Sequence, residues 1–228
     1  MHILETKRGI MKTFFKKYSF ALWVLYIPVY FICFIYLEKR TDVNFNYIHC
    51  MIDDKIPFME AFIVPYLLWF AYIFVTVAYF VLFEQKEFNR LAWYLASGMT
   101  MFLIISYIYP NALDLRPDVY PRNNIFTDLV KNLQSTDTPT NVLPSIHVYN
   151  TLCVTTALLL NERFAKSTLR RILIIILSVL IILSTMFLKQ HSVIDVISAF
   201  FMAVVFFVLI YVLPQYLSIE KKMNDTTD

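Results

Sequence analysis

The fold class follows from residues 169–188, which read LRRILIIILSVLIILSTMFL. No Asp, Glu, Lys or Arg occurs between Arg171 and Lys189. An α-helix needs about 20 mostly apolar residues to cross a hydrocarbon core about 30 Å thick, so this stretch predicts a transmembrane helix. The whole chain has the same character, since 59% of its 228 residues are hydrophobic and 16% are charged. This composition excludes a disordered protein or a disulfide framework, and it argues against a soluble enzyme.

Five further apolar stretches are long enough to cross a membrane. The expected fold is therefore all-α: a polytopic membrane protein in which six transmembrane helices form one helical bundle, with residues 1–228 as a single domain. The predicted spans are Tyr18–Leu37, Pro57–Phe83, Leu91–Tyr109, Pro144–Leu160, Leu169–Leu188 and His191–Leu213.

The longest loop, residues 110–143, joins the third and fourth predicted spans. It contains four apolar residues at helical spacing, which predict a short helix on the membrane surface. Near the same membrane face, Glu60 is expected to extend its carboxylate toward the headgroups. The four apolar residues are Phe126, Leu129, Val130 and Leu133.

The distribution of Lys and Arg predicts the orientation, because cytoplasmic loops of membrane proteins carry an excess of both. With the N-terminus inside, thirteen of the 20 basic residues lie on the cytoplasmic side and seven outside. We therefore expect a multi-pass protein of the cell membrane with both termini in the cytoplasm. The seven outer residues are Lys39, Arg40, Lys55, Arg116, Arg122, Lys131 and Lys189.

A few polar residues near the outer ends of the spans are candidates for chemistry. Asp195 lies inside the sixth predicted span, where a carboxylate is costly and points to function. His191 precedes it by four residues, so a helix through both would place them on one face. His147 follows Ser145 at the start of the fourth span, where free backbone N–H groups favour a phosphate. Arg116, after the third span, has a side chain suited to bidentate phosphate binding.

These residues resemble the three sequence blocks of the type 2 phosphatidic acid phosphatase (PAP2) superfamily. Those blocks are Lys-x6-Arg-Pro, Pro-Ser-x-His and Ser-Arg-x5-His-x3-Asp. The corresponding segments here are residues 109–117, 144–147 and 184–195, in the same order and predicted on one membrane face. Each block alone is a weak match, but the three together within residues 109–195 are a specific one.

The chain departs from the family pattern at two basic positions. Tyr109 stands where the first block has lysine, and Thr185 where the third block has arginine. Lys189 could restore one positive charge near His191, and Arg122 or Lys131 another. The residues around Thr185 and His191 are similar to the branch that includes inositol-phosphorylceramide synthases, which transfer a phosphorylated headgroup between alcohols.

The resemblance implies a role for each matched residue. His191 would attack phosphorus and become a phosphohistidine, Asp195 would orient it, and His147 would act as general acid and base. Arg116, Ser145 and Lys189 would bind the phosphoryl oxygens, and neither a metal nor another cofactor would be needed. The implied partners are a lipid phosphate substrate and membrane lipids. The formal net charge of +3 is too small to predict a nucleic-acid partner.

Three functions remain open from the sequence. The first is a lipid phosphatase acting on a phosphate or pyrophosphate monoester. The second is a headgroup transferase that shares its covalent step. The third is a transporter or a catalytically silent membrane protein. The sequence specifies neither the lipid nor the oligomeric state.

Overall fold

The computed structural model describes residues 22–40 and 42–224. Helices dominate it, and a few short turns and two short strands complete the regular structure of this part of the chain. The helices are Leu22–Glu38, α2 (Ile63–Phe83), α3 (Gln85–Ile108), α4 (Ile125–Thr136), α5 (Ile146–Leu160), α6 (Glu162–Ala165), α7 (Thr168–Phe187), α8 (Val193–Phe207) and α9 (Leu213–Asn224). The π-helical turn η3 (Val208–Val212) lies between α8 and α9. Two 3₁₀ turns, η1 (Asp53–Lys55) and η2 (Glu60–Phe62), precede α2.

The lengths of these helices confirm a helical protein of membrane type. Four helices in the described part of the chain are long and apolar enough to cross a membrane. Two more, Leu22–Glu38 and Ile146–Leu160, are apolar but shorter, so six spans remain a proposal. Residues 18–21 of the first predicted span lie outside the described residues. The four long helices are Glu60–Phe83, Gln85–Ile108, Thr168–Phe187 and Val193–Glu220.

The second and third helices do not start where the apolar stretches predicted. Helix α2 begins at Ile63, after the turn η2, rather than at Pro57, and α3 begins at Gln85 rather than at Leu91. An apolar stretch marks only the part of a helix that suits hydrocarbon, and the polar residues 85–90 extend α3 beyond it because Gln, Lys, Glu and Arg are good helix formers.

Two further predicted helix starts were wrong, and capping explains both. Ser145 is the N-cap of α5, since its Oγ accepts from the Val148 N–H at 3.3 Å, so Pro144 precedes the helix. Ser192 caps α8 in a capping box with Asp195. His191 therefore lies before the sixth helix rather than on it. A cap needs a side-chain oxygen outside the helix, and each serine provides one.

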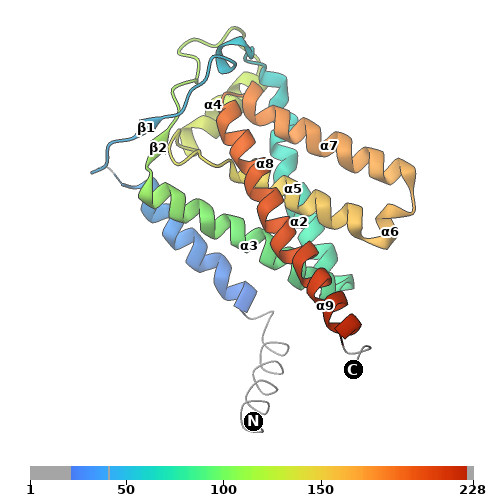
Figure 1. Ribbon diagram of the computed structural model, residues 1–228. Helices are drawn as coiled ribbons and strands as arrows, with labels where there is room; N and C mark the ends of the chain where they lie inside the picture. The colour runs from blue at the N-terminus through green and yellow to red at the C-terminus, as the bar shows by residue number, and fades with distance from the viewer. Residues whose placement is uncertain (1–21, 41, 225–228) are drawn as a thin grey trace.

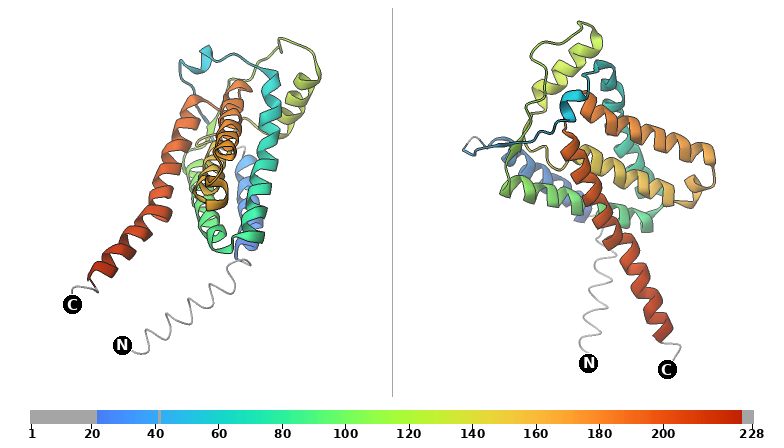
Figure 2. Two further views of the ribbon diagram at one scale, coloured as in Figure 1. Left: turned by 90° about the vertical axis from the view of Figure 1, so that its right-hand side faces the viewer. Right: turned by 45° about the horizontal axis from the view of Figure 1, so that its top comes forward.

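Helix α5 lies at the centre of the bundle and contacts α2, α3, α7 and α8. Its fully buried side chains include Val148, Tyr149 and Cys153. In the left panel of Figure 2 the helices run alongside one another, and α4 lies at the end of the molecule opposite the end of α9. The helix Leu22–Glu38 lies beside α3 (Figure 1), where Tyr26 Oη donates to the Ala96 carbonyl at 3.1 Å.

Gly98 allows α3 to pack closely against α5. A Cβ atom at this position would lie 2.0 Å from Cζ of Tyr149. That ring is fully buried, and its hydroxyl donates to the Tyr94 carbonyl. Any larger residue at Gly98 would therefore force the two helices apart.

The two long loops, residues 38–56 and 110–143 of the predicted topology, are joined through a parallel strand pair, which the sequence did not suggest. Strands β1 (Asn46–Tyr47) and β2 (Asn111–Ala112) pair in register. The buried Asn111 side chain then accepts from the backbone N–H groups of Val142 and Leu143, at 2.8 and 2.9 Å. These contacts fix the segment that leads into Ser145 and α5.

The predicted helix in the loop 110–143 is present as α4, while its place on a membrane surface stays a prediction. Val130 is fully buried and packs with Ile63, Tyr66 and Leu188. The expectation for Glu60 was wrong. Its side chain is buried, and its Oε1 accepts from Arg122 Nη1 at 3.1 Å and from Asn124 Nδ2 at 3.0 Å. A buried carboxylate needs such partners, and here they hold the start of α4 against the turn η2 that precedes α2.

Candidate active site

The two predicted histidines meet at one end of the bundle. His147 lies in the first turn of α5, and His191 lies just before the Ser192 cap of α8. His147 Nδ1 is 3.5 Å from His191 Nε2, although the residues are 44 positions apart in the chain. The N-termini of α5 and α8 are joined directly, because the Ser145 N–H donates to the Asp195 carbonyl at 3.2 Å.

Asp195 supports His191 from the first turn of α8. Its Oδ2 lies 3.3 Å from His191 Nδ1 and accepts from the Ser192 N–H at 2.8 Å. Asp195 is fully buried, and His191 is 8% exposed. A carboxylate accepts only, so it fixes the proton of His191 on Nδ1 and leaves Nε2 with a free electron pair. That electron pair faces His147.

A second chain of polar groups reaches His147 from the opposite side. Tyr66 Oη of α2 lies 3.1 Å from His147 Nε2, and the same hydroxyl donates to Asp137 Oδ2 at 3.3 Å. Asp137 immediately follows α4. Burial raises the pKa of the Asp137 carboxyl above its ordinary value, although His191, Arg116 and the Tyr66 hydroxyl oppose the shift.

Gln190, the residue before His191, pairs with the predicted Arg116. Arg116 Nη2 donates to Gln190 Oε1 at 2.8 Å and to the Asp137 carbonyl at 2.7 Å. Since a guanidinium only donates, the amide oxygen of Gln190 must face it, and the amide nitrogen is left free. In the described part of the chain, Gln190 Nε2 and Arg116 Nε are buried without a hydrogen-bond partner. Burial lowers the pKa of the Arg116 guanidinium, and the Asp137 carboxylate partly offsets this shift.

Lys189 has a different neighbour from the one the sequence suggested. Its Nζ donates to the Asp53 carbonyl at 2.6 Å. The Asp53 side chain in turn accepts from Ser192 Oγ at 2.6 Å and from the Val193 N–H at 2.8 Å. Burial alone would raise the pKa of Asp53, but hydrogen bonds from Ser192, Val193 and Cys50 outweigh it and lower the pKa below its ordinary value. Lys189 and Asp53 thus hold the start of α8 in place.

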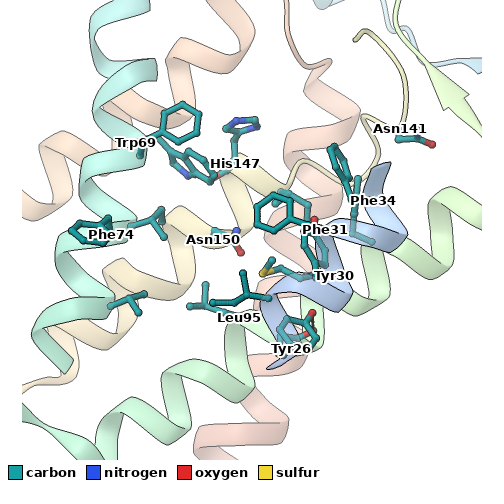
Figure 3. A pocket seen from close by; sticks show the side chains of 18 of the residues that line it. Tyr26, Tyr30, Phe31, Phe34, Trp69, Phe74, Leu95, Asn141, His147 and Asn150 are labelled. Carbon is teal, nitrogen blue, oxygen red and sulfur yellow. Dashed lines mark hydrogen bonds between the residues drawn. The ribbon is translucent and has the colours of Figure 1, made fainter. Parts of the chain in front are cut away.

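A cavity of about 600 Å³ opens from the histidine pair into the apolar part of the bundle. Aromatic side chains of the helix Leu22–Glu38 face those of α2 across it (Figure 3), with His147 at one end. Several of these aromatic residues are more than half exposed on the outside of the bundle, among them Phe31 and Phe74, so the cavity reaches the surface between these helices. Its polar end is formed by Asp137, Thr138, Thr140, Asn141, His147, Gln190 and His191.

The predicted site residues therefore fall into two groups. His147 and His191 line the cavity, and Asp195 lies directly behind His191. The described lining residues do not include Ser145, Arg116 or Lys189. Ser145 caps α5, Arg116 donates to Gln190, and Lys189 donates to the Asp53 carbonyl. Tyr109 is exposed, and the Thr185 hydroxyl donates within its own helix to the Ile182 carbonyl. Among the described residues no group of three His, Cys, Asp or Glu side chains is arranged to hold a metal ion.

Sequence reasoning missed Tyr66, Asp137 and Gln190. Tyr66 is one of many aromatic residues in a span, and Asp137 lies in a polar loop, so neither stands out in the sequence. Gln190 is adjacent to His191, but only its contact with Arg116 shows which way its amide points.

Comparison with known proteins gives one match. The sequence model of the PAP2 superfamily matches residues 90–219, which is more than half of the chain and includes His147, His191 and Asp195. No curated protein and no solved structure shows significant similarity to the chain.

Proposed function

The chain belongs to the PAP2 superfamily, and from this premise we propose that it hydrolyses a phosphate or pyrophosphate monoester of a lipid through a phosphohistidine intermediate. Membership of the family supports a phosphatase-type enzyme that acts on lipids. The observation that carries the finer proposal is the facing pair of ring nitrogens, His191 Nε2 and His147 Nδ1, at the polar end of an apolar cavity.

In the first proposed step, the free electron pair of His191 Nε2 attacks phosphorus. An N–P bond forms, and the bond from phosphorus to the lipid oxygen breaks. The leaving oxygen takes a proton from His147, which acts as general acid. Asp195 stabilises the positive charge that develops on His191, as a carboxylate does behind a catalytic imidazole.

In the second step, His147 takes a proton from water while the water oxygen attacks phosphorus. The N–P bond breaks, inorganic phosphate leaves, and His191 regains its electron pair. An alcohol in place of water would give a phosphotransferase, which is the alternative function. The two reactions share the phosphohistidine, so the acceptor is decided by the second step.

The transferring phosphoryl group needs hydrogen-bond donors that replace the family's two missing basic residues. Gln190 Nε2 is buried, unpartnered in the described chain and at the polar end of the cavity. Arg116 orients it and adds positive charge, while the N-terminus of α5, capped by Ser145, provides a favourable dipole. We propose that these groups stabilise the transition state without a metal, and that Lys189 contributes only through its contact with Asp53.

This assignment predicts a large effect of Gln190→Glu. The variant keeps an oxygen for Arg116 but turns a donor toward the phosphate into an acceptor with negative charge. We expect turnover to fall by about 10²–10³-fold, the usual cost of one lost donor to a transition-state oxygen. Steady-state phosphate release measures it.

Gln85→Glu is the matched control for that variant. Gln85 has the same side chain, but it is exposed at the start of α3 and does not line the cavity. Its activity should stay near the wild-type value. Equal activity of Gln190→Glu and wild type would refute Gln190 as a phosphate donor.

The shape of the cavity supports a lipid as the substrate. One end is polar, and the longer part is lined by aromatic and aliphatic side chains, such as Tyr30, Phe34 and Leu95 (Figure 3). Its volume lies in the range of about 300–1,000 Å³ that is common for small-molecule sites. A phosphate head at His191 would place the hydrocarbon chain between the helix Leu22–Glu38 and α2.

A panel of lipid phosphates tests the function. Purified protein receives phosphatidic acid, an isoprenyl pyrophosphate or phosphatidylglycerol phosphate, with and without an alcohol acceptor and with and without EDTA. We expect release of free phosphate that survives EDTA. Transfer to the alcohol at the expense of phosphate release would favour the transferase, whereas loss of activity with EDTA that magnesium restores would contradict the histidine mechanism.

The proposed topology has six spans, cytoplasmic termini and the site on the outer face. It predicts that Asp118→Cys reacts with a membrane-impermeant thiol reagent in intact cells, while Lys166→Cys reacts only after permeabilisation. Both positions are exposed, and Cys50 should be replaced by serine to remove a background thiol in the same outer region. The opposite labelling pattern would invert the orientation.

A further inference from the structure

His147 Nε2 contacts a residue outside the three PAP2 sequence blocks, and that residue contacts another outside them. Nε2 lies 3.1 Å from Tyr66 Oη, and that hydroxyl lies 3.3 Å from Asp137 Oδ2. Tyr66 is 1% exposed and packs with Ile63, Val130 and Leu188. Its hydroxyl therefore has a fixed position between the imidazole and the carboxylate.

The Asp137 carboxylate determines where the protons of Tyr66 and His147 lie. A tyrosine hydroxyl has one proton, and an ionised carboxylate only accepts. Tyr66 thus donates to Asp137, and its electron pair accepts the proton on His147 Nε2. The remaining nitrogen, Nδ1, is the one that faces His191 Nε2 at 3.5 Å. The proton that His147 exchanges with the substrate must then move through Nδ1.

From this geometry we infer that Tyr66 and Asp137 are positioning residues that fix the tautomer of His147 and stabilise its charged form, an inference that rests on the proposed function. Each of the two catalytic histidines is then oriented by a carboxylate. Asp195 contacts His191 directly at Nδ1, whereas Asp137 acts on His147 through the Tyr66 hydroxyl at Nε2. In each case the nitrogen away from the carboxylate faces the reaction centre.

Neighbouring groups hold the carboxylate in place. Arg116 Nη2 donates to the Asp137 backbone carbonyl at 2.7 Å, so the guanidinium fixes the residue without occupying Oδ2. Around His147, the titratable and charged groups are Tyr66 and His191 in contact, and Asp137, Asp195 and Arg116 one residue further out. Of the two carboxylates, Asp137 is the one linked to His147 by Tyr66.

The test uses Tyr66→Phe and Asp137→Asn and measures both chemical steps. Each variant should still form phosphoenzyme from an activated substrate whose leaving group needs no proton. Dephosphorylation should slow by about 10–100-fold, the range known for partners that orient an imidazole at metal sites. In Asp137→Asn the acidic limb of the dephosphorylation rate should also move to lower pH, because the neutral amide stabilises the imidazolium less.

Tyr72→Phe is the matched control for Tyr66→Phe. Tyr72 lies on the same helix, and its hydroxyl contacts Thr155 and Ser178 rather than a histidine. Asp128→Asn on α4 is the control for Asp137→Asn, since the Asp128 carboxylate makes a loose contact with Lys131, at 3.9 Å, and does not line the cavity. Both controls should keep the wild-type pH profile and dephosphorylation rate.

Two outcomes separate the inference from the function on which it rests. If the wild-type protein forms no phosphoenzyme, the proposed function fails. The wild-type protein can also form phosphoenzyme while both variants dephosphorylate at the wild-type rate and with the wild-type acidic limb. In that case the function stands and the inference is overturned. A drop in folded protein without a change in the pH profile would also overturn it, because a purely structural role has that effect.

Discussion

His191→Ala is expected to reduce lipid phosphate hydrolysis to the background rate. The variant removes the nitrogen that would form the bond to phosphorus, and no other described residue places a free electron pair opposite His147 Nδ1. Because a nucleophile has no partial substitute, the loss should exceed that of any other single change in the site. Phosphate release from the best lipid of the panel measures it.

Two further variants make this result specific. His49→Ala removes an exposed histidine that contacts Asp54 and does not line the cavity, and it should retain full activity. His191→Gln fills the same space more closely, so it should be as inactive as His191→Ala while keeping the packing. Substantial turnover in both His191 variants would show that another group attacks phosphorus.

His147→Ala is expected to have the second-largest effect, and a different one. Without its general acid and base, the enzyme should lose about 10²–10⁴-fold in turnover of a natural lipid. With an activated aryl phosphate, whose leaving group needs no proton, His191 should still be phosphorylated. The second step would remain slow, so phosphoenzyme should accumulate.

Rapid quenching after mixing with the activated substrate measures that accumulation. A burst close to one phosphate per enzyme, followed by slow release, is the expected time course. Asp195→Asn provides the contrast, since loss of the carboxylate behind His191 should weaken the first step as well. A His147→Ala enzyme with neither a burst nor turnover would mean that His147 is needed for phosphorylation itself.

The sequence predicts the helices well because a membrane imposes a length and a composition on each one. It also predicts that His147, His191 and Asp195 meet, since their spacing matches family blocks. The expected reason was incomplete, however. His191 lies before the α8 helix, and its contact with Asp195 arises because the Ser192 cap turns the chain back toward the first helical turn.

The parts that could not be predicted depend on contacts between distant loops. Gln190 is oriented by Arg116, and Asp137 is brought to Tyr66 by the packing of α4 on α2. A single sequence gives no spacing rule for such pairs. Lys189 is the converse case. Proximity along the chain suggests a phosphate contact, whereas in the structure its ammonium donates to the Asp53 carbonyl.

The position of the covalent phosphate tests the central claim most directly. Purified wild-type protein is incubated briefly with a radioactive lipid phosphate, denatured, digested with trypsin and treated with acid or base. Cleavage after Lys189 and Lys221 gives a peptide of residues 190–221 with His191 as its one histidine, whereas His147 falls in the peptide of residues 132–163. We expect acid-labile, base-stable label in peptide 190–221. Label in peptide 132–163, or full turnover with no labelled peptide, would contradict His191 as the nucleophile.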